Sequence, residues 1–226
     1  MYIGMVDIYE SYRSANSEAE AGNFRNAALL YQRIAQSEMP LTERAPFHLL
    51  AADAFLEAGS SDEALVECQT AISHVPNAIA YRLLGRILME ADRPVEAEQA
   101  LRRSLQLDTT PTACLYLGIL LSDTDPTEAE GILRQAISLD PRFDEAHFQL
   151  GVFLIRQERF DDAIESLRVA ASYDPDYALE IREIGYRLVS EKRFADAIKY
   201  LGTYLSLKPN DISTFELLQE VSTAHS

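Results

Sequence analysis

Residues 148–175 read FQLGVFLIRQERFDDAIESLRVAASYDP, and residues 181–209 read IREIGYRLVSEKRFADAIKYLGTYLSLKP. The two stretches repeat one pattern of small, aromatic and apolar residues at a single constant offset. The matched pairs are Gly151/Gly185, Phe160/Phe194, Ala163/Ala197, Leu167/Leu201 and Pro175/Pro209. A fixed period of about 34 residues is typical of stacked structural repeats. The chain is therefore expected to fold as an array of similar units.

The pattern extends upstream, where an apolar residue followed by glycine recurs at nearly the same spacing. Further on, each unit has an alanine, a larger apolar residue one helical turn later and, in most units, a closing proline; the unit that contains Ala64 has Ala51-Ala52 in place of the apolar–glycine pair. The positions are Gly85, Gly118, Gly151 and Gly185; Ala64, Ala97, Ala129, Ala163 and Ala197; Cys68, Leu101, Leu133, Leu167 and Leu201; and Pro76, Pro141, Pro175 and Pro209. Two antiparallel helices pack closely when a small residue on one receives a large residue from the other. Proline then ends the second helix, because it has no N–H to donate.

This pattern resembles the tetratricopeptide repeat, a helix–turn–helix unit of about 34 residues. The resemblance implies an all-α, right-handed superhelical solenoid of about six units, which form one continuous domain over residues 1–226. The units are placed at 8–44, 45–77, 78–110, 111–143, 144–177 and 178–211. A capping helix is expected at 212–222, with Asp211 as its N-cap and with an apolar stripe of Ile212, Phe215, Leu218 and Val221.

Composition narrows the classes of partner. The chain has 36 acidic and 20 basic residues, a net charge of −16, whereas nucleic-acid and anionic-membrane surfaces need clustered Lys and Arg. No apolar run approaches the roughly 18–20 residues that cross a membrane, which argues against direct insertion. No signal peptide is visible at the start, which favours the cytoplasm. Cys68 and Cys114 lie in apolar helical patterns and are interpreted as reduced core residues.

No catalytic or cofactor-binding motif is found in the sequence. It has neither a glycine-rich phosphate loop nor a Gly-x-Ser-x-Gly nucleophile elbow. His48, His74, His147 and His225 are scattered, and His48 and His147 have no second ligand at the i+3 or i+4 position, so they are interpreted as packing residues. We therefore expect a protein that is not an enzyme and that has no metal and no cofactor.

The resemblance implies that binding residues lie on the first helix of each unit, along a concave groove. The positions that correspond to this groove are Leu49, Asp53, Arg82, Arg86, Leu115, Tyr116, Ile119, Phe148, Gln149, Val152, Ile155, Arg156, Arg182 and Tyr186, with Tyr9 and Tyr12 in the first unit. Two interpretations of the apolar members are open: they contact a partner, or they pack between neighbouring first helices. A carboxylate clamp like that of chaperone co-factors is rejected, because only Asn16 matches its pattern.

The function expected from these features is that of a non-enzymatic adaptor or scaffold. It would bind an apolar or amphipathic segment of another protein, helical or extended, with acidic groups that meet Arg82, Arg86, Arg156 or Arg182. An alternative is a chaperone or assembly factor that shields apolar segments of client proteins. Self-association, in which the groove holds a segment of a second copy, is a further alternative.

Overall fold

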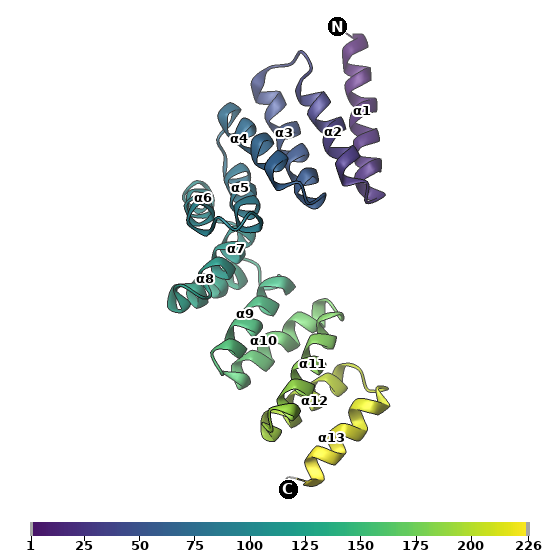
Figure 1. Cartoon of the computed structure of the whole chain (residues 1–226), viewed down its shortest axis with the longest axis vertical. Coiled ribbons are helices and arrows are strands. Elements are labelled where there is room, and N and C mark those ends of the chain that lie inside the picture. Colours follow the sequence, from purple (N-terminus) through teal and green to yellow (C-terminus); the bar gives the residue numbers. More distant parts are fainter. Residues whose placement is uncertain (1, 225–226) are drawn as a thin grey trace. The chain divides into compact units, whose positions relative to one another are not determined.

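The computed structural model describes the backbone of residues 2–224 and the side chains of residues 7–224. This part of the chain forms thirteen α-helices and no strand, so the all-α repeat prediction is confirmed (Figure 1). The helices are α1 (Tyr2–Glu20), α2 (Phe24–Ala35), α3 (Leu41–Glu57), α4 (Ser61–His74), α5 (Ala78–Glu90), α6 (Pro94–Leu107), α7 (Pro111–Leu121), α8 (Pro126–Leu139), α9 (Asp144–Arg156), α10 (Phe160–Tyr173), α11 (Tyr177–Ser190), α12 (Phe194–Leu207) and α13 (Ile212–Ala224).

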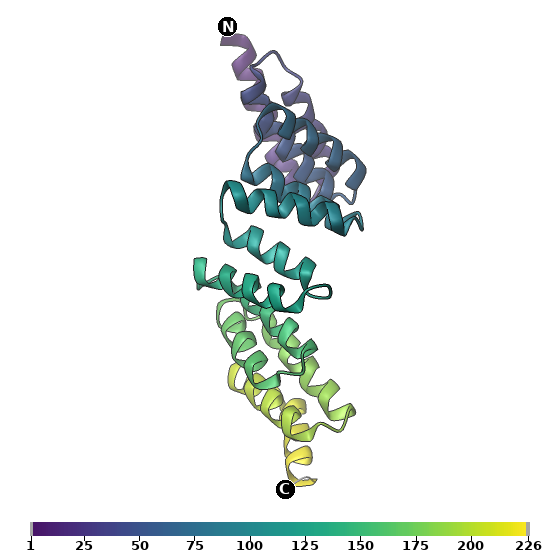
Figure 2. The ribbon, with the colours of Figure 1, turned by 90° about the vertical axis from the view of Figure 1, so that its left-hand side faces the viewer.

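Contacts between residues divide the helices into two compact units, Met1–Leu120 (unit 1) and Leu121–Ser226 (unit 2). Within each unit, helices that follow one another in the sequence pack against each other, as Figure 2 shows for the α9–α10 and α11–α12 hairpins of unit 2. In unit 1 the same arrangement joins α1 to α2, α3 to α4 and α5 to α6. None of the helices in residues 2–224 has the length and hydrophobicity of a membrane span.

Glycine in the first helix of a hairpin allows the second helix to approach closely. A Cβ atom added to Gly85 would lie 2.5 Å from Leu101 Cγ, and one added to Gly151 would lie 2.7 Å from Leu167 Cγ. At Gly185 the nearest atom would be Leu201 Cδ2, at 2.6 Å. These distances are too short for an alanine to fit without movement of the leucine. The expected pairing of small and large residues is therefore confirmed in three hairpins.

Helix α13 is oriented differently from the sequence prediction. Asp211 caps it, since its Oδ1 accepts a hydrogen bond from the Thr214 backbone N–H at 3.1 Å. Val221 is buried as expected, but Ile212 is 71% exposed and Phe215 is 49% exposed, whereas Thr214 is fully buried. The predicted stripe is therefore wrong for Ile212 and Phe215. The register of the repeat decides the orientation: Thr214 and Val221 take the places that the buried Ile181 and Leu188 hold on α11, one repeat earlier.

The Asp211 carboxylate fastens α13 to the preceding hairpin. Its Oδ2 accepts a hydrogen bond from Tyr204 Oη at 2.8 Å and lies 3.3 Å from Arg182 Nη1, and its Oδ1 accepts one from Ser213 Oγ at 2.7 Å. The hydrogen bonds from Ser213, from the Thr214 N–H and from Tyr204 hold the pKa of Asp211 well below its ordinary value. The ionised carboxylate therefore stabilises the docked helix.

We expect Asp211→Ala to loosen α13, because the substitution removes the cap and the links to α11 and α12. Hydrogen exchange should show lower protection of the α13 backbone amides in this variant, with little change in α8–α10. Because the folded-state pKa is depressed, the stabilisation is complete above about pH 4 and is lost as the pH falls below that value. Ser213→Ala, which removes one donor and leaves the carboxylate, should have the smaller effect. Unchanged protection in Asp211→Ala would contradict this account.

Candidate binding surface

The groove positions predicted from the sequence differ in how accessible they are. Leu115 is fully buried, which agrees with the second interpretation, in which the apolar positions pack between neighbouring first helices. Asp53 and Arg156 are exposed. Tyr9 and Tyr12 of the first repeat are exposed as well. The other positions are half-buried: Leu49, Arg82, Arg86, Tyr116 and Ile119 in unit 1, and Phe148, Gln149, Val152, Ile155, Arg182 and Tyr186 in unit 2. These side chains pack against their neighbours and still present part of their surface.

In unit 1, Arg86 is surrounded by carboxylates of its own chain. Its Nη2 lies 2.6 Å from Glu57 Oε1 and 3.3 Å from Asp53 Oδ1, and its Nε lies 4.0 Å from Glu90 Oε1. Burial raises the pKa of Asp53, and the nearby Arg86 partly opposes that shift. A carboxylate brought by a partner would therefore meet three acids around one guanidinium. Arg86 is thus already paired within its own chain, which does not favour it as a contact for an acidic partner group.

Two arginines of unit 2 are likewise engaged within the chain. Arg156 Nη1 lies 3.3 Å from Asp123 Oδ1, although both side chains are largely exposed. Arg182 pairs with Glu183 at 3.0 Å and with Asp211 at 3.3 Å. The Arg182 guanidinium also lies 5.7 Å from the ring centroids of both Tyr186 and Tyr204, within the range of a cation–π contact. Arg182 therefore holds α11, α12 and α13 together, a structural role that its spacing in the sequence did not indicate.

Aromatic side chains meet on the first helices of both units. In unit 2, Phe148 of α9 stacks on Tyr177 of α11, with ring centroids 4.5 Å apart and an interplanar angle of 18°. In unit 1, Tyr12 lies 6.1 Å from Phe47, edge to face, and Tyr9 is 67% exposed. The sequence interpretation missed Tyr177, because the predicted boundary places it at the end of the repeat 144–177, just before the first position of the next repeat. A usable signal was present: Phe143 occupies the same place in the preceding repeat.

A buried polar cluster connects α2, α3 and α4 in unit 1. His48 Nδ1 lies 2.6 Å from Glu67 Oε2, and Gln32 Nε2 donates to Glu67 Oε1 at 2.7 Å. The His74 ring lies 5.2 Å from that of His48, and its Nδ1 is buried without a hydrogen-bond partner. Burial lowers the pKa of His74, and His48 adds to this shift. The cluster is enclosed by packing, so it has the character of a core network rather than of a reactive site.

The two cysteines are buried and unpaired, as the sequence predicted. Burial raises the pKa of Cys68 to about 12 and also raises that of Cys114, so the reactive thiolate form is disfavoured at neutral pH. Within residues 2–224, no group of three or more His, Cys, Asp or Glu side chains is arranged to hold a metal ion.

Family models described as tetratricopeptide repeat match residues 12–72, 49–112 and 120–182. The chain belongs to the tetratricopeptide repeat family. Proteins with these repeats are in general interaction scaffolds for other proteins, and they are in general not enzymes. No curated protein matches this tetratricopeptide sequence significantly.

Solved structures share the tetratricopeptide fold at low sequence identity. A chain of the APC/C hetero-tetramer Cut9–Hcn1 superposes with a TM-score of 0.73 at 19% identity; the match covers 95% of the present chain and 42% of that chain. The present chain therefore spans less than half of that relative. The pilF protein of Pseudomonas aeruginosa gives a TM-score of 0.68 at 20% identity, with coverage of 94% and 97%. YrrB, described as a tetratricopeptide protein with an unusual peptide-binding site, gives 0.55 at 20% identity, with coverage of 77% and 92%.

Proposed function

We propose that this tetratricopeptide chain is a non-enzymatic scaffold that binds an apolar or amphipathic segment of another protein on the first helices of its repeats. The observation that carries the proposal is the half-exposed Phe148–Tyr177 stack on α9 and α11. Stacked aromatic rings that remain partly open to solvent offer a rigid apolar contact at little cost in side-chain entropy. The peptide-binding site described for YrrB, which has the same fold, supports the same kind of partner.

Neighbouring side chains enlarge this contact area in unit 2. Val152 and Ile155 are half-buried on the same helix as Phe148, and Leu179 on α11 is 46% exposed. Apolar surface that a partner covers contributes roughly 25 cal/mol per Å² before the costs of association are subtracted. Affinity on this surface therefore comes mainly from apolar burial, and the polar groups around it set the specificity.

The proposal is tested by affinity capture from a lysate of the source organism, with mass spectrometry as the readout. We expect Phe148→Glu to reduce capture of the main partner at least about tenfold, since a charge placed on the stack costs about 1.4 kcal/mol or more on binding. Leu139→Glu is the matched control, because Leu139 is an apolar residue of unit 2 that is 45% exposed on a second helix, α8. Circular dichroism establishes that both variants are folded.

Capture of the partner by the folded Phe148→Glu variant would overturn the proposal. Loss of the partner in Leu139→Glu, with retention in Phe148→Glu, would instead place recognition on the second helices.

The same experiment addresses the shielding alternative. A scaffold retains one partner at a saturable stoichiometry, whereas a chaperone captures several unrelated apolar clients and also suppresses their aggregation.

A further inference from the structure

The outer face of α13 has the register of the binding face of α11. Ile212, Phe215 and Glu216 take the places, one repeat later, of Leu179, Arg182 and Glu183. On α13 this face is open, since Ile212 is 71% and Phe215 is 49% exposed, while Thr214 and Val221 on the opposite side are buried. The last helix is therefore more than a polar cap, because it carries two large apolar side chains where the other repeats carry their binding residues.

Direct contacts join α9, α11 and α13 into one surface within unit 2. Phe148 of α9 stacks on Tyr177 of α11 at 4.5 Å. Tyr186 Oη of α11 lies 2.8 Å from Thr214 Oγ1 of α13, and Arg182 of α11 pairs with Asp211, the residue that caps α13. A segment that lies on the Phe148–Tyr177 stack can thus continue over Tyr186 to Phe215 without leaving the surface.

The packing side of α13 does not admit another helix of the repeat type. Leu218 corresponds to Gly185 of the preceding repeat and so takes the place at which the earlier hairpins have glycine. At Gly185, the Leu201 side chain comes within 2.6 Å of the position of a Cβ atom, which leaves no room for a larger residue. A second helix packed against α13 in the way that α12 packs against α11 would collide with Leu218. The occupant expected on α13 is therefore a segment on its outer face.

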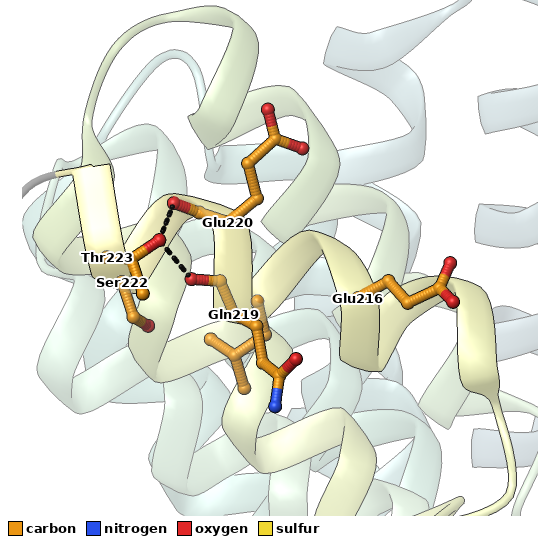
Figure 3. A pocket seen from close by; sticks show the side chains of 6 residues that line it. Glu216, Gln219, Glu220, Ser222 and Thr223 are labelled. Atoms are coloured by element: carbon orange, nitrogen blue, oxygen red, sulfur yellow. Dashed lines mark hydrogen bonds between the residues drawn. The ribbon is translucent and has the colours of Figure 1, made fainter.

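The charges around this surface are predominantly negative. Glu183 has a side chain that is 58% exposed, and Glu216 is exposed on α13, where its carboxylate extends away from the helix (Figure 3). Arg182 is balanced by Glu183 and by Asp211. Burial raises the pKa of Tyr177, and the charges of Asp144 and Glu145 raise it further, which is consistent with a negative potential at the stack. Positively charged groups on a partner would be attracted by this negative potential.

A shallow hollow on α13 lies beside these residues. It is lined by Glu216, Leu218, Gln219, Glu220, Ser222 and Thr223. In Figure 3 the Thr223 hydroxyl points back to its own helix, where it donates to the carbonyl oxygens of Gln219 and Glu220. Glu216 and Glu220 are both exposed. A partner can therefore place an apolar side chain against Phe215 and, next to it, a Lys or Arg side chain that reaches Glu216.

We infer that unit 2 binds its partner segment across α9, α11 and α13, and that this segment carries Lys or Arg next to large apolar side chains. The inference rests on the proposed function and adds to it Phe215, Ile212 and Glu216 as contact residues. It also reverses the polarity expected from the sequence, which placed acidic groups on the partner.

The test uses two fluorescein-labelled amphipathic peptides, each long enough for about four helical turns and with identical Leu and Phe positions. One has Lys and the other has Glu at every polar position, and fluorescence polarisation measures their binding to the full chain. We expect the Lys peptide to bind at least about tenfold more tightly than the Glu peptide. Phe215→Ala and Glu216→Lys should each weaken its binding by about fivefold, on the scale of one interface contact. Leu139→Ala, the matched exposed control, should leave binding unchanged.

Equal or tighter binding of the Glu peptide would overturn the inference, as would unchanged affinity in both Phe215→Ala and Glu216→Lys. The inference would also be overturned if the Lys peptide did not bind at a protein concentration of about 100 μM, since a weaker interaction than this would not support a specific interface. Loss of peptide binding in Phe148→Glu together with full binding in Phe215→Ala would remove α13 from the site and leave the proposed function intact. The proposed function itself fails only if the folded Phe148→Glu variant retains the partner captured from lysate.

Discussion

Gly151→Ala is expected to destabilise unit 2 by about 1–3 kcal/mol, although alanine is the better helix former. The added methyl group would lie 2.7 Å from Leu167 Cγ and 3.4 Å from the Ala163 carbonyl oxygen. Overpacking of a close helix contact on this scale outweighs the gain of up to about 1 kcal/mol in helix propensity. Urea unfolding followed by circular dichroism, combined with hydrogen exchange in α9 and α10, measures the loss.

Gly131→Ala is the matched control, because Gly131 lies inside α8 of the same unit and nothing would lie within 4 Å of an added Cβ atom. This substitution should stabilise unit 2 by about 0.5–1 kcal/mol through propensity and lower entropy of the unfolded chain. The same Gly→Ala substitution is thus expected to lower the stability of unit 2 at position 151 and to raise it at position 131. A Gly151→Ala variant as stable as the wild type would show that Leu167 moves aside freely and that the glycine is not required for close packing.

Glu67→Ala is expected to destabilise unit 1 by about 3 kcal/mol or more. The substitution leaves His48, which is 8% exposed, and the Gln32 amide without their shared carboxylate partner. Removal of one member of a buried pair leaves the other polar group without solvent or partner, and this cost exceeds the net contribution of the pair itself. Thermal and urea unfolding of the full chain, with hydrogen exchange of α3 and α4, locates the effect in unit 1.

Glu63→Ala controls for the loss of a charge on the same helix. Glu63 lies one turn before Glu67 and pairs with Arg25 at 3.2 Å, but its side chain is 46% exposed. An exposed pair of this kind contributes about 0–1 kcal/mol, so Glu63→Ala should be nearly neutral. The double variant His48→Leu/Glu67→Leu should recover much of the lost stability, because a buried pair replaced by apolar residues is often close to neutral. Equal effects of Glu63→Ala and Glu67→Ala would contradict the assignment of Glu67 to the core.

The proposed binding surface was only partly predictable from the sequence. The family positions located Phe148 and Tyr186, which the structure leaves half-exposed, but they also included Leu115, which is fully buried. The ion pairs that the arginines form could not be predicted from the family positions. Arg86 pairs with two carboxylates of α3, those of Asp53 and Glu57, and Arg182 pairs with the carboxylate that caps α13. Pairing between separate helices depends on which helices stack, and the spacing of residues within one repeat does not specify that.

The sequence by itself determined the period of the array, the helix–turn–helix unit and the small residues at the close contacts. These features are local, because a glycine that recurs once in a repeat and a leucine at a fixed distance after it define the same contact in all three hairpins where the glycine is packed. The tertiary structure alone decided the orientation of α13, the partners of the arginines and the burial of Glu67. The hydrophobic pattern of α13 favoured a stripe through Ile212 and Phe215, whereas packing against α11 and α12 buries Thr214 and Val221 instead. The physical reason is that, within the described residues, α13 docks against α11 and α12, and these neighbours, rather than the hydrophobicity of α13 itself, select its buried side.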